Sequence, residues 1–142
     1  MPSLKKILVL AFIFALSGTA LFAQTTVKGR LLKASYTGLD TTNLYEPLVT
    51  IKQSETLGVK YLSLELSGIK KRDNKYYEFY NDGTAPSPLI WKRRMRGVVV
   101  EPLNVVIALS GGFNGSNNLV VTYEYVDRLG FGSVTYIIAL EK

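Results

Sequence analysis

Apolar and polar residues alternate with a period of two in several separate segments of this chain. Over Lys60–Ser67, leucine occupies every second position and polar or aromatic residues occupy the positions between them. Successive side chains of a β-strand point to opposite faces, so this alternation predicts a half-buried strand with the leucines inward. The same pattern recurs in Leu119–Val126 and Ser133–Leu140, and these two neighbouring segments predict a terminal hairpin.

Turn-forming residues separate the other expected strands. Asn81-Asp82-Gly83, followed by Pro86 and Pro88, is strong turn chemistry. Pro102 lacks the N–H that a ladder needs, so it marks a break, a bulge or an edge position. The remaining expected strands are Thr26–Ser35, Leu48–Gln53, Tyr76–Tyr80, Leu89–Arg96 and Val98–Leu109, the last of which is one long strand or two. The expected loops are 38–47, 70–75, 111–118 and 127–132. No segment keeps an apolar period of 3.6, so we expect almost no helix.

About eight strands separated by turns predict an all-β fold. We expect one antiparallel β-sandwich or jelly roll spanning residues 24–142, and the alternative is a small closed β-barrel. The chain has 142 residues and no cysteine, so disulfides cannot contribute to its stability. A domain of this size buries enough apolar surface to fold around a single core.

The N-terminal 23 residues have the organisation of a secretory signal peptide. Lys5 and Lys6 precede the apolar run Ile7–Ala15, and small residues follow before Gln24. We predict cleavage after Ala23, with cleavage after Ala20 as the competing site. The protein is therefore expected to be exported to the periplasm, the cell surface or the medium, with no membrane span after cleavage. The absence of disulfides in an exported domain favours a bacterial source.

Composition excludes much catalytic chemistry. The chain has no histidine and no cysteine, so neither a Ser-His-Asp triad nor a His or Cys zinc site can be built. Its carboxylates are scattered, and no spacing brings two of them together for glycoside hydrolysis. We expect no enzymatic activity, no cofactor and no metal.

The strongest candidate for a binding site is the basic segment 91–96, WKRRMR. In an extended strand, Lys92, Arg94 and Arg96 share one face at a spacing of roughly 6.6–7 Å, which suits the charges of a polyanion. Trp91 points to the other face, with Arg93 and Met95. We expect the neighbouring rings of Trp91, Tyr76 and Tyr80 to stack on sugar rings or bases. The structural alternative is that charges on an edge strand prevent sheets from aggregating.

Two functions are consistent with these features. The first is an exported, non-catalytic structural or assembly protein of the cell surface, the periplasm or an extracellular filament, whose partner is itself or another surface protein. Terminal-strand exchange is one route to such assembly. The alternative is a secreted binding module that holds an acidic polysaccharide or other polyanion on its basic strand face. Removal of Lys5 and Lys6 lowers the net charge from +6 to 15 − 11 = +4. Export and this modest charge argue against intracellular nucleic acid as the partner.

Overall fold

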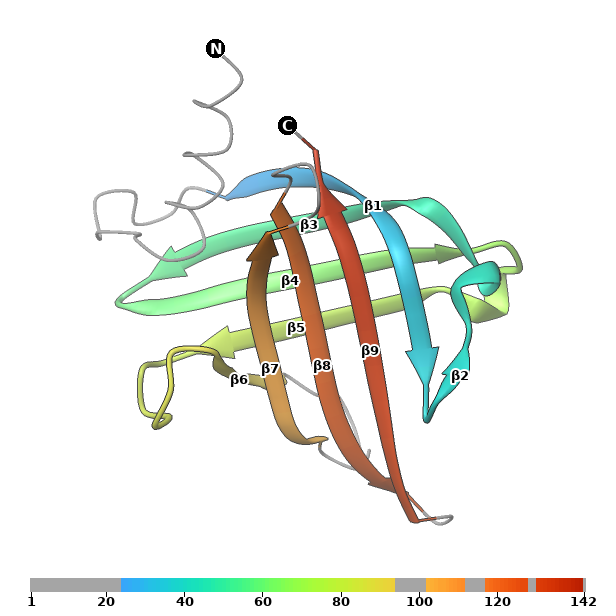
Figure 1. Ribbon diagram of the computed structural model, residues 1–142. Helices are drawn as coiled ribbons and strands as arrows, with labels where there is room; N and C mark the ends of the chain where they lie inside the picture. Colours follow the sequence, from blue (N-terminus) through green and yellow to red (C-terminus); the bar gives the residue numbers. More distant parts are fainter. Residues whose placement is uncertain (1–23, 94–101, 112–116, 128–129, 142) are drawn as a thin grey trace.

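The protein folds into a closed antiparallel β-barrel. The computed structural model describes residues 24–93, 102–111, 117–127 and 130–141. The strands there form one sheet of order β2-β1-β3-β4-β5-β6-β7-β8-β9, and β1 also pairs with β9, which closes the sheet into a ring (Figure 1). Eight strands make up the ring, and the short β2 pairs with β1 alone at its side.

The strands of the barrel differ widely in length. They are β1 (Thr25–Tyr36), β2 (Leu39–Asp40), β3 (Tyr45–Thr56), β4 (Val59–Gly68), β5 (Lys75–Asn81), β6 (Ile90–Arg93), β7 (Pro102–Gly111), β8 (Asn117–Asp127) and β9 (Gly130–Leu140). Two 3-10 turns, η1 (Thr42–Leu44) and η2 (Lys71–Asp73), are the only helical segments in the described part of the chain. Within these ranges no helix is long and apolar enough to cross a membrane. The predicted signal peptide and most of the predicted 111–118 loop lie outside the described residues.

The all-β prediction is confirmed, but the architecture is the alternative, a small closed barrel, rather than the sandwich. The difference lies in β1, which pairs with β3 through residues 25–30 and with β9 through residues 29–36. A register shift between Leu31 and Lys33 interrupts the β9 pairing. A bulge of this kind bends a strand, so one strand can serve two differently directed sets of neighbours. In Figure 1, β3, β4 and β5 run across β7, β8 and β9, and β1 curves from the first set to the second.

The predicted alternation decides which side chains fill the barrel. The three leucines of β4 are buried at every second position, as are the inward residues of the terminal hairpin β8–β9. Within β6, Trp91 is buried and Lys92 is exposed, so these residues lie on opposite faces as predicted. The connection between β8 and β9 is shorter than the predicted loop 127–132, because β8 runs to Asp127 and β9 begins at Gly130. Pro102 begins β7 and a register shift follows it, which confirms the predicted irregularity.

Tyrosine hydroxyls form a hydrogen-bonded cluster inside the barrel. Tyr77 and Tyr136 share a hydrogen bond of 2.7 Å between their hydroxyl oxygens, and the Tyr123 hydroxyl donates to Tyr77 Oη at 3.1 Å. Burial raises the pKa of Tyr123 and of Tyr136 far above the ordinary value, so both phenols stay neutral. The Arg93 guanidinium lies 4.7 Å from the centre of the Tyr77 ring, and this cation–π contact adds to the packing. The middle of the barrel is therefore filled, and ligand sites have to be sought at its surface and its ends.

Candidate binding site on the outer face of the barrel

The larger of two hollows described in this structure lies on the outer face of β3, β4 and β5. It has a volume of about 380 Å³. Hydroxyl, amine, carboxylate and aromatic side chains face outward along its lining, and Gln24 and Thr56 also line it. We give the name outer groove to six of these residues: Lys52, Ser54, Tyr61, Ser63, Tyr76 and Glu78. The registers place Lys52 opposite Ser63 and Ser63 opposite Glu78, so three adjacent strands form its floor.

Tyr76 is the most accessible aromatic ring of the outer groove. This residue is 57% exposed, although aromatic residues are usually buried for packing. The Tyr76 hydroxyl donates to Glu78 Oε1 at 3.1 Å. Partial burial is the main cause of a raised pKa at Tyr76, and the hydrogen bond to Glu78 is the next. Because this pKa lies above the usual value near 10, the hydroxyl keeps its proton at physiological pH. The result is a flat apolar ring edged by a fixed donor–acceptor pair.

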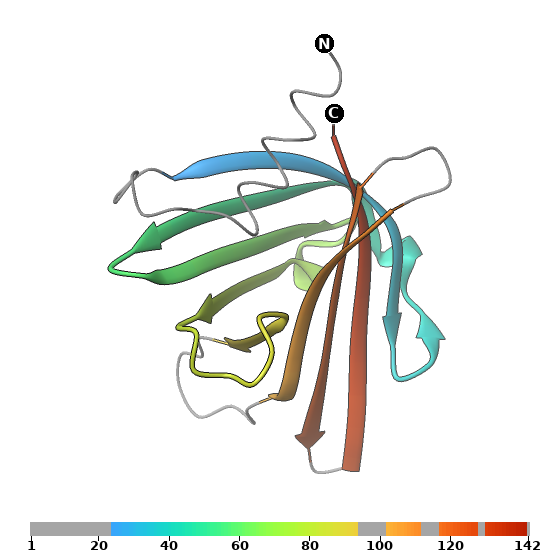
Figure 2. The ribbon, with the colours of Figure 1, turned by 60° about the vertical axis from the view of Figure 1, so that its left-hand side comes forward.

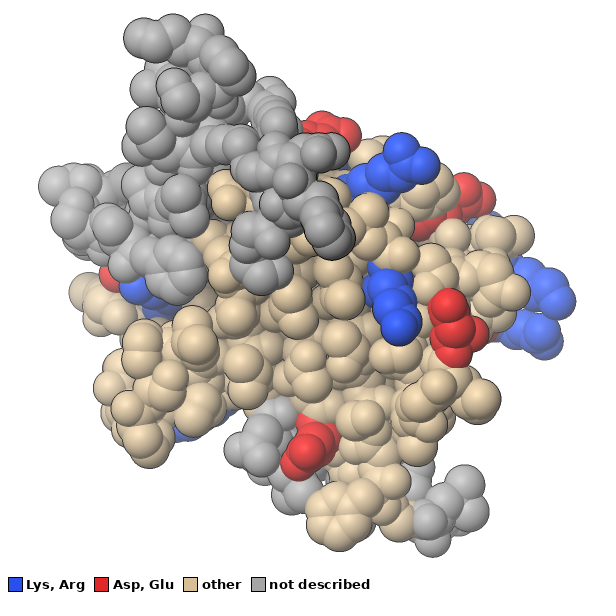
Figure 3. Space-filling view, in the orientation of Figure 1, with Lys and Arg blue, Asp and Glu red and all other residues tan. Residues whose placement is uncertain are grey.

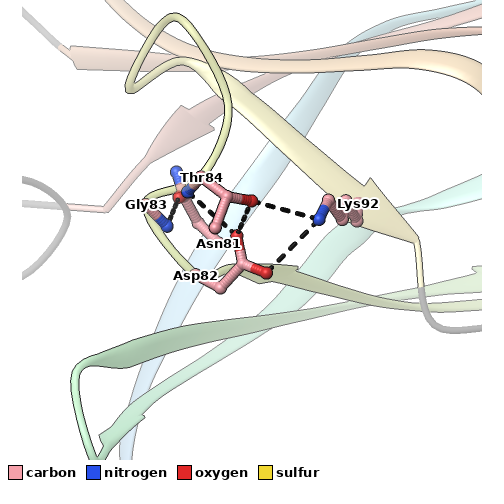
Figure 4. Close-up of polar contacts among 5 residues, drawn as sticks. All are labelled: Asn81, Asp82, Gly83, Thr84 and Lys92. Carbon is pink, nitrogen blue, oxygen red and sulfur yellow. Dashed lines mark hydrogen bonds and ion pairs between the residues drawn. The ribbon is translucent and has the colours of Figure 1, made fainter.

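Tyr80 and Lys92 extend this face towards β6. They are paired residues of β5 and β6, and the Lys92 ammonium lies 5.9 Å from the centre of the Tyr80 ring. Lys92 Nζ also forms an ion pair of 3.3 Å with Asp82 Oδ2 and donates to Thr84 Oγ1 at 3.2 Å (Figure 4). Because Asp82 neutralises Lys92, this lysine supplies little net positive charge to a ligand. Its described contacts hold the β5–β6 loop to β6.

The structure brings some of the predicted site residues together and separates others. Tyr76, Tyr80 and Lys92 all lie on the outer face of β5 and β6. Trp91 is only 5% exposed and faces the interior, so it does not share a surface with them. Arg94 and Arg96 lie outside the described residues, so the continuous basic row stays a prediction.

Sequence reasoning missed most of the outer groove. The alternation in Lys60–Ser67 places Tyr61 and Ser63 on the outward face of β4, but nothing in it shows which strands lie on either side. Lys52 and Glu78 become neighbours of Ser63 only through the β3–β4 and β4–β5 registers. The signal that was available is the uneven distribution of tyrosine: β5 carries Tyr76 and Tyr80 on its outward face.

The outer groove offers hydrogen bonds and ring stacking, and it has mixed charge. Lys52 and Glu78 are its only charged members, so their formal charges cancel. Among the described residues, no three His, Cys, Asp or Glu side chains come together in a group that could hold a metal ion. The groove can bind a polyhydroxylated molecule whose hydroxyls donate to Glu78 and to the Tyr76 hydroxyl oxygen and accept from Lys52 and Ser63.

Comparison with known proteins adds no relative: no family model, no curated protein and no solved structure matches this chain. The strand order and the outer groove define the class of this protein: a small closed antiparallel β-barrel with a polar and aromatic groove on its outer face.

Proposed function

We propose that this protein is an exported, non-catalytic binding module that holds a glycan in the outer groove. The observation that supports this most is the exposed Tyr76 ring on the wall of a 380 Å³ hollow, with Glu78 and Ser63 beside it. An aromatic ring packs against the apolar face of a sugar, and neighbouring polar groups then fix its hydroxyls. The signal-peptide pattern at the N-terminus supports export.

The charges of the outer groove refine the earlier expectation of an acidic ligand. Lys92 is paired with Asp82, and Lys52 is balanced by Glu78 within the groove. Exposed ion pairs and single surface charges contribute little at physiological salt. We therefore propose that stacking and hydrogen bonding dominate, so affinity should fall little between low and moderate salt.

A glycan array with three proteins tests this function. The wild type should retain a defined set of glycans, and Tyr76→Ala should weaken their binding about tenfold or more, because it removes the stacking platform. Phe131→Ala is the matched control, since Phe131 is also an exposed ring (75%) but lies on β9. Equal losses in both variants would show that Tyr76 has no specific role, and a steep salt dependence would favour a polyanion site instead.

Assembly is a second candidate, favoured by a surface with few charges. Among the described outward positions of β7, β8 and β9, Glu124 alone is charged; the others are Val106, Ala108, Asn118, Val120, Thr122, Phe131, Ser133, Thr135, Ile137 and Ala139. In Figure 3 this face of the molecule is mostly tan. A second copy could cover such a face with the Glu124 carboxylate as the one charge removed from water among these described positions.

Strand exchange is a costly route to that assembly. Within the described part of the barrel, β1 pairs with both β3 and β9, so donating it to a neighbour would open the ring. Face-to-face packing of β7–β9 keeps the ring closed. Light scattering after size exclusion tests it: we expect a dimer or larger species that Ile137→Lys converts to monomers, whereas a concentration-independent monomer of the wild type would reject assembly.

A further inference from the structure

Exposed aliphatic side chains gather at one end of the barrel, around the two 3-10 turns η1 and η2. Four such residues of the described chain lie there: Leu32, Leu44, Leu48 and Ile69. Ile69 is the most accessible of them, at 63%. Its N–H donates to the Leu44 carbonyl at 2.9 Å, which joins the end of β4 to η1. Contiguous apolar surface in contact with water marks a site of interaction.

Irregular strand pairing puts these leucines on the outside. In β1, the register shift after Leu31 leaves both Leu32 and Lys33 exposed, although Leu31 is buried. In β3, the shift that follows Tyr45 leaves three consecutive residues, 46–48, exposed. Bulges re-aim side chains in this way. Figure 2 shows η1 beside the bent part of β1, and the Ala34 N–H donates to Thr42 Oγ1 at 2.9 Å to hold the two together.

Cations surround the exposed aliphatic side chains. Five exposed basic residues lie at this end, and with the four aliphatic ones we call them the basic end: Arg30, Lys33, Lys70, Lys71 and Arg72. No salt bridge joins any of these five to a carboxylate within the described ranges. Leu48 lies directly opposite Arg30 in the β1–β3 register, so cation and aliphatic side chain are neighbours.

The positive charge of the described barrel is concentrated at the basic end. Segments 30–48 and 69–75 hold six basic and three acidic residues. The other described residues hold five basic and seven acidic ones. Figure 3 shows Lys and Arg side chains at the right-hand edge of the molecule, the side on which Figure 1 shows η1 and η2. The two ends of the molecule therefore differ in sign, and the basic end favours an anionic partner.

We infer that the basic end docks on an anionic lipid bilayer. A bilayer surface supplies both complements: phosphate groups for the cations and, just below them, acyl chains for the aliphatic side chains. Lysine and arginine keep their charges at headgroup level while their stems cover apolar surface. A soluble polyanion would engage the cations and leave Leu48 and Ile69 in water, so the aliphatic residues favour lipid. This surface shares no residue with the outer groove.

Co-sedimentation with vesicles tests the docking. The protein used is the exported form, residues 24–142, because the strands of the closed sheet lie within residues 25–140. Vesicles of phosphatidylcholine are compared with vesicles in which about one third of the lipid is phosphatidylglycerol. We expect saturable binding to the anionic vesicles, binding about tenfold or more weaker to the neutral ones, and weaker binding as the salt concentration rises.

Matched substitutions at the two ends of β4 separate docking from nonspecific adsorption. Ile69 follows this ten-residue strand and Leu57 precedes it, so the two lie at opposite ends of about 33 Å of strand. Ile69→Ser should weaken binding to the anionic vesicles about tenfold, because it removes a side chain that enters the acyl region. Leu57→Ser, at a residue 89% exposed, should leave binding unchanged. Lys71→Ser should weaken binding about fivefold, whereas Lys60→Ser should not.

The outcomes of these comparisons are distinct. None of the four substituted residues is buried, so each variant should fold. Equal losses within either matched pair, equal binding to neutral and anionic vesicles, or no binding at all would overturn the inference. A loss in Lys71→Ser together with wild-type binding in Ile69→Ser would also overturn it, because the surface would then be one for a soluble polyanion.

Discussion

Gly29 is where the barrel closes, and replacing it tests that closure. It pairs with Val49 of β3 and with Leu140 of β9 at the same time, and its neighbour Arg30 likewise pairs with both strands. A Cβ atom at this position would lie 2.5 Å from Ile138 Cγ2 and 3.1 Å from the Ala139 carbonyl oxygen. Ile138 is fully buried, so its methyl group cannot move aside without displacing the core.

Two opposing effects set the expected magnitude for Gly29→Ala. Overpacking of this kind costs about 1–3 kcal/mol. Replacement of glycine also restricts the unfolded chain, which returns about 0.4–1 kcal/mol. At the middle of these ranges the packing cost is about 2 kcal/mol and the return about 0.7 kcal/mol, so we expect the free energy of unfolding to fall by about 1.3 kcal/mol, and by at most about 2.6 kcal/mol. This is equivalent to a few degrees in Tm for a domain of this size.

A double-mutant cycle measured by equilibrium urea unfolding isolates the contact. Ile138→Ala alone should cost about 2–5 kcal/mol, because it leaves a cavity. In that background Gly29→Ala no longer meets Cγ2, so its cost should vanish or change sign, giving a coupling of about 1–3 kcal/mol between the two positions. If Gly29→Ala is neutral in the wild type, or costs the same in both backgrounds, β1 and β9 do not approach as described.

Three further predictions concern buried and titrating groups. Tyr77→Phe should lower the free energy of unfolding by about 1–3 kcal/mol, because it deprives the hydroxyls of Tyr123 and Tyr136 of their shared partner. Equilibrium urea unfolding measures this change, and an unchanged free energy of unfolding would mean that water replaces the Tyr77 hydroxyl. Gln53 is buried, and its Oε1 has no hydrogen-bond partner among the described residues. Gln53→Met should therefore raise the free energy of unfolding by about 1 kcal/mol. A lower free energy of unfolding in this variant would imply that the oxygen has a partner. Hydrogen bonds from Thr84 lower the pKa of Asp82 from 3.8 to about 2. The stabilisation of the loop by Asp82 is therefore fully present above pH 3.8 and is lost as the pH falls towards 2. The fluorescence of Trp91 should follow this change, and Asp82→Asn should abolish the pH dependence.

The local parts of this fold could be predicted because they depend on neighbouring residues. The leucines of β4 and the inward residues of the β8–β9 hairpin follow from alternation alone, and Pro102 marks the irregular start of β7. Closure of the barrel could not be predicted in this way. It depends on β1 meeting β9 from the other end of the chain, through a glycine whose small size matters only because Ile138 lies against it.

The candidate sites show the same division. Alternation placed Trp91 and Lys92 on opposite faces of β6, and the structure confirms it. It did not reveal that the Trp91 face is the interior, or that the Asn81–Pro88 turn folds over it. Lys92 looked like a ligand-binding cation, but Asp82 lies ten residues earlier in the loop and pairs with it. Pairing between separate strands and loops, which no periodicity encodes, decides which charges remain available.

NMR mapping of the bound ligand is the sharpest test of whether a glycan binds on the outer face of β3–β5. The glycan selected on the array would be titrated into the ¹⁵N-labelled protein while the backbone amide resonances are followed. We predict saturable shifts centred on Lys52, Ser63, Tyr76 and Glu78, with the resonances of β8 and β9 unchanged. Shifts centred on β7–β9 or on another part of the barrel, or an array that retains no glycan, would rule out glycan binding in the outer groove.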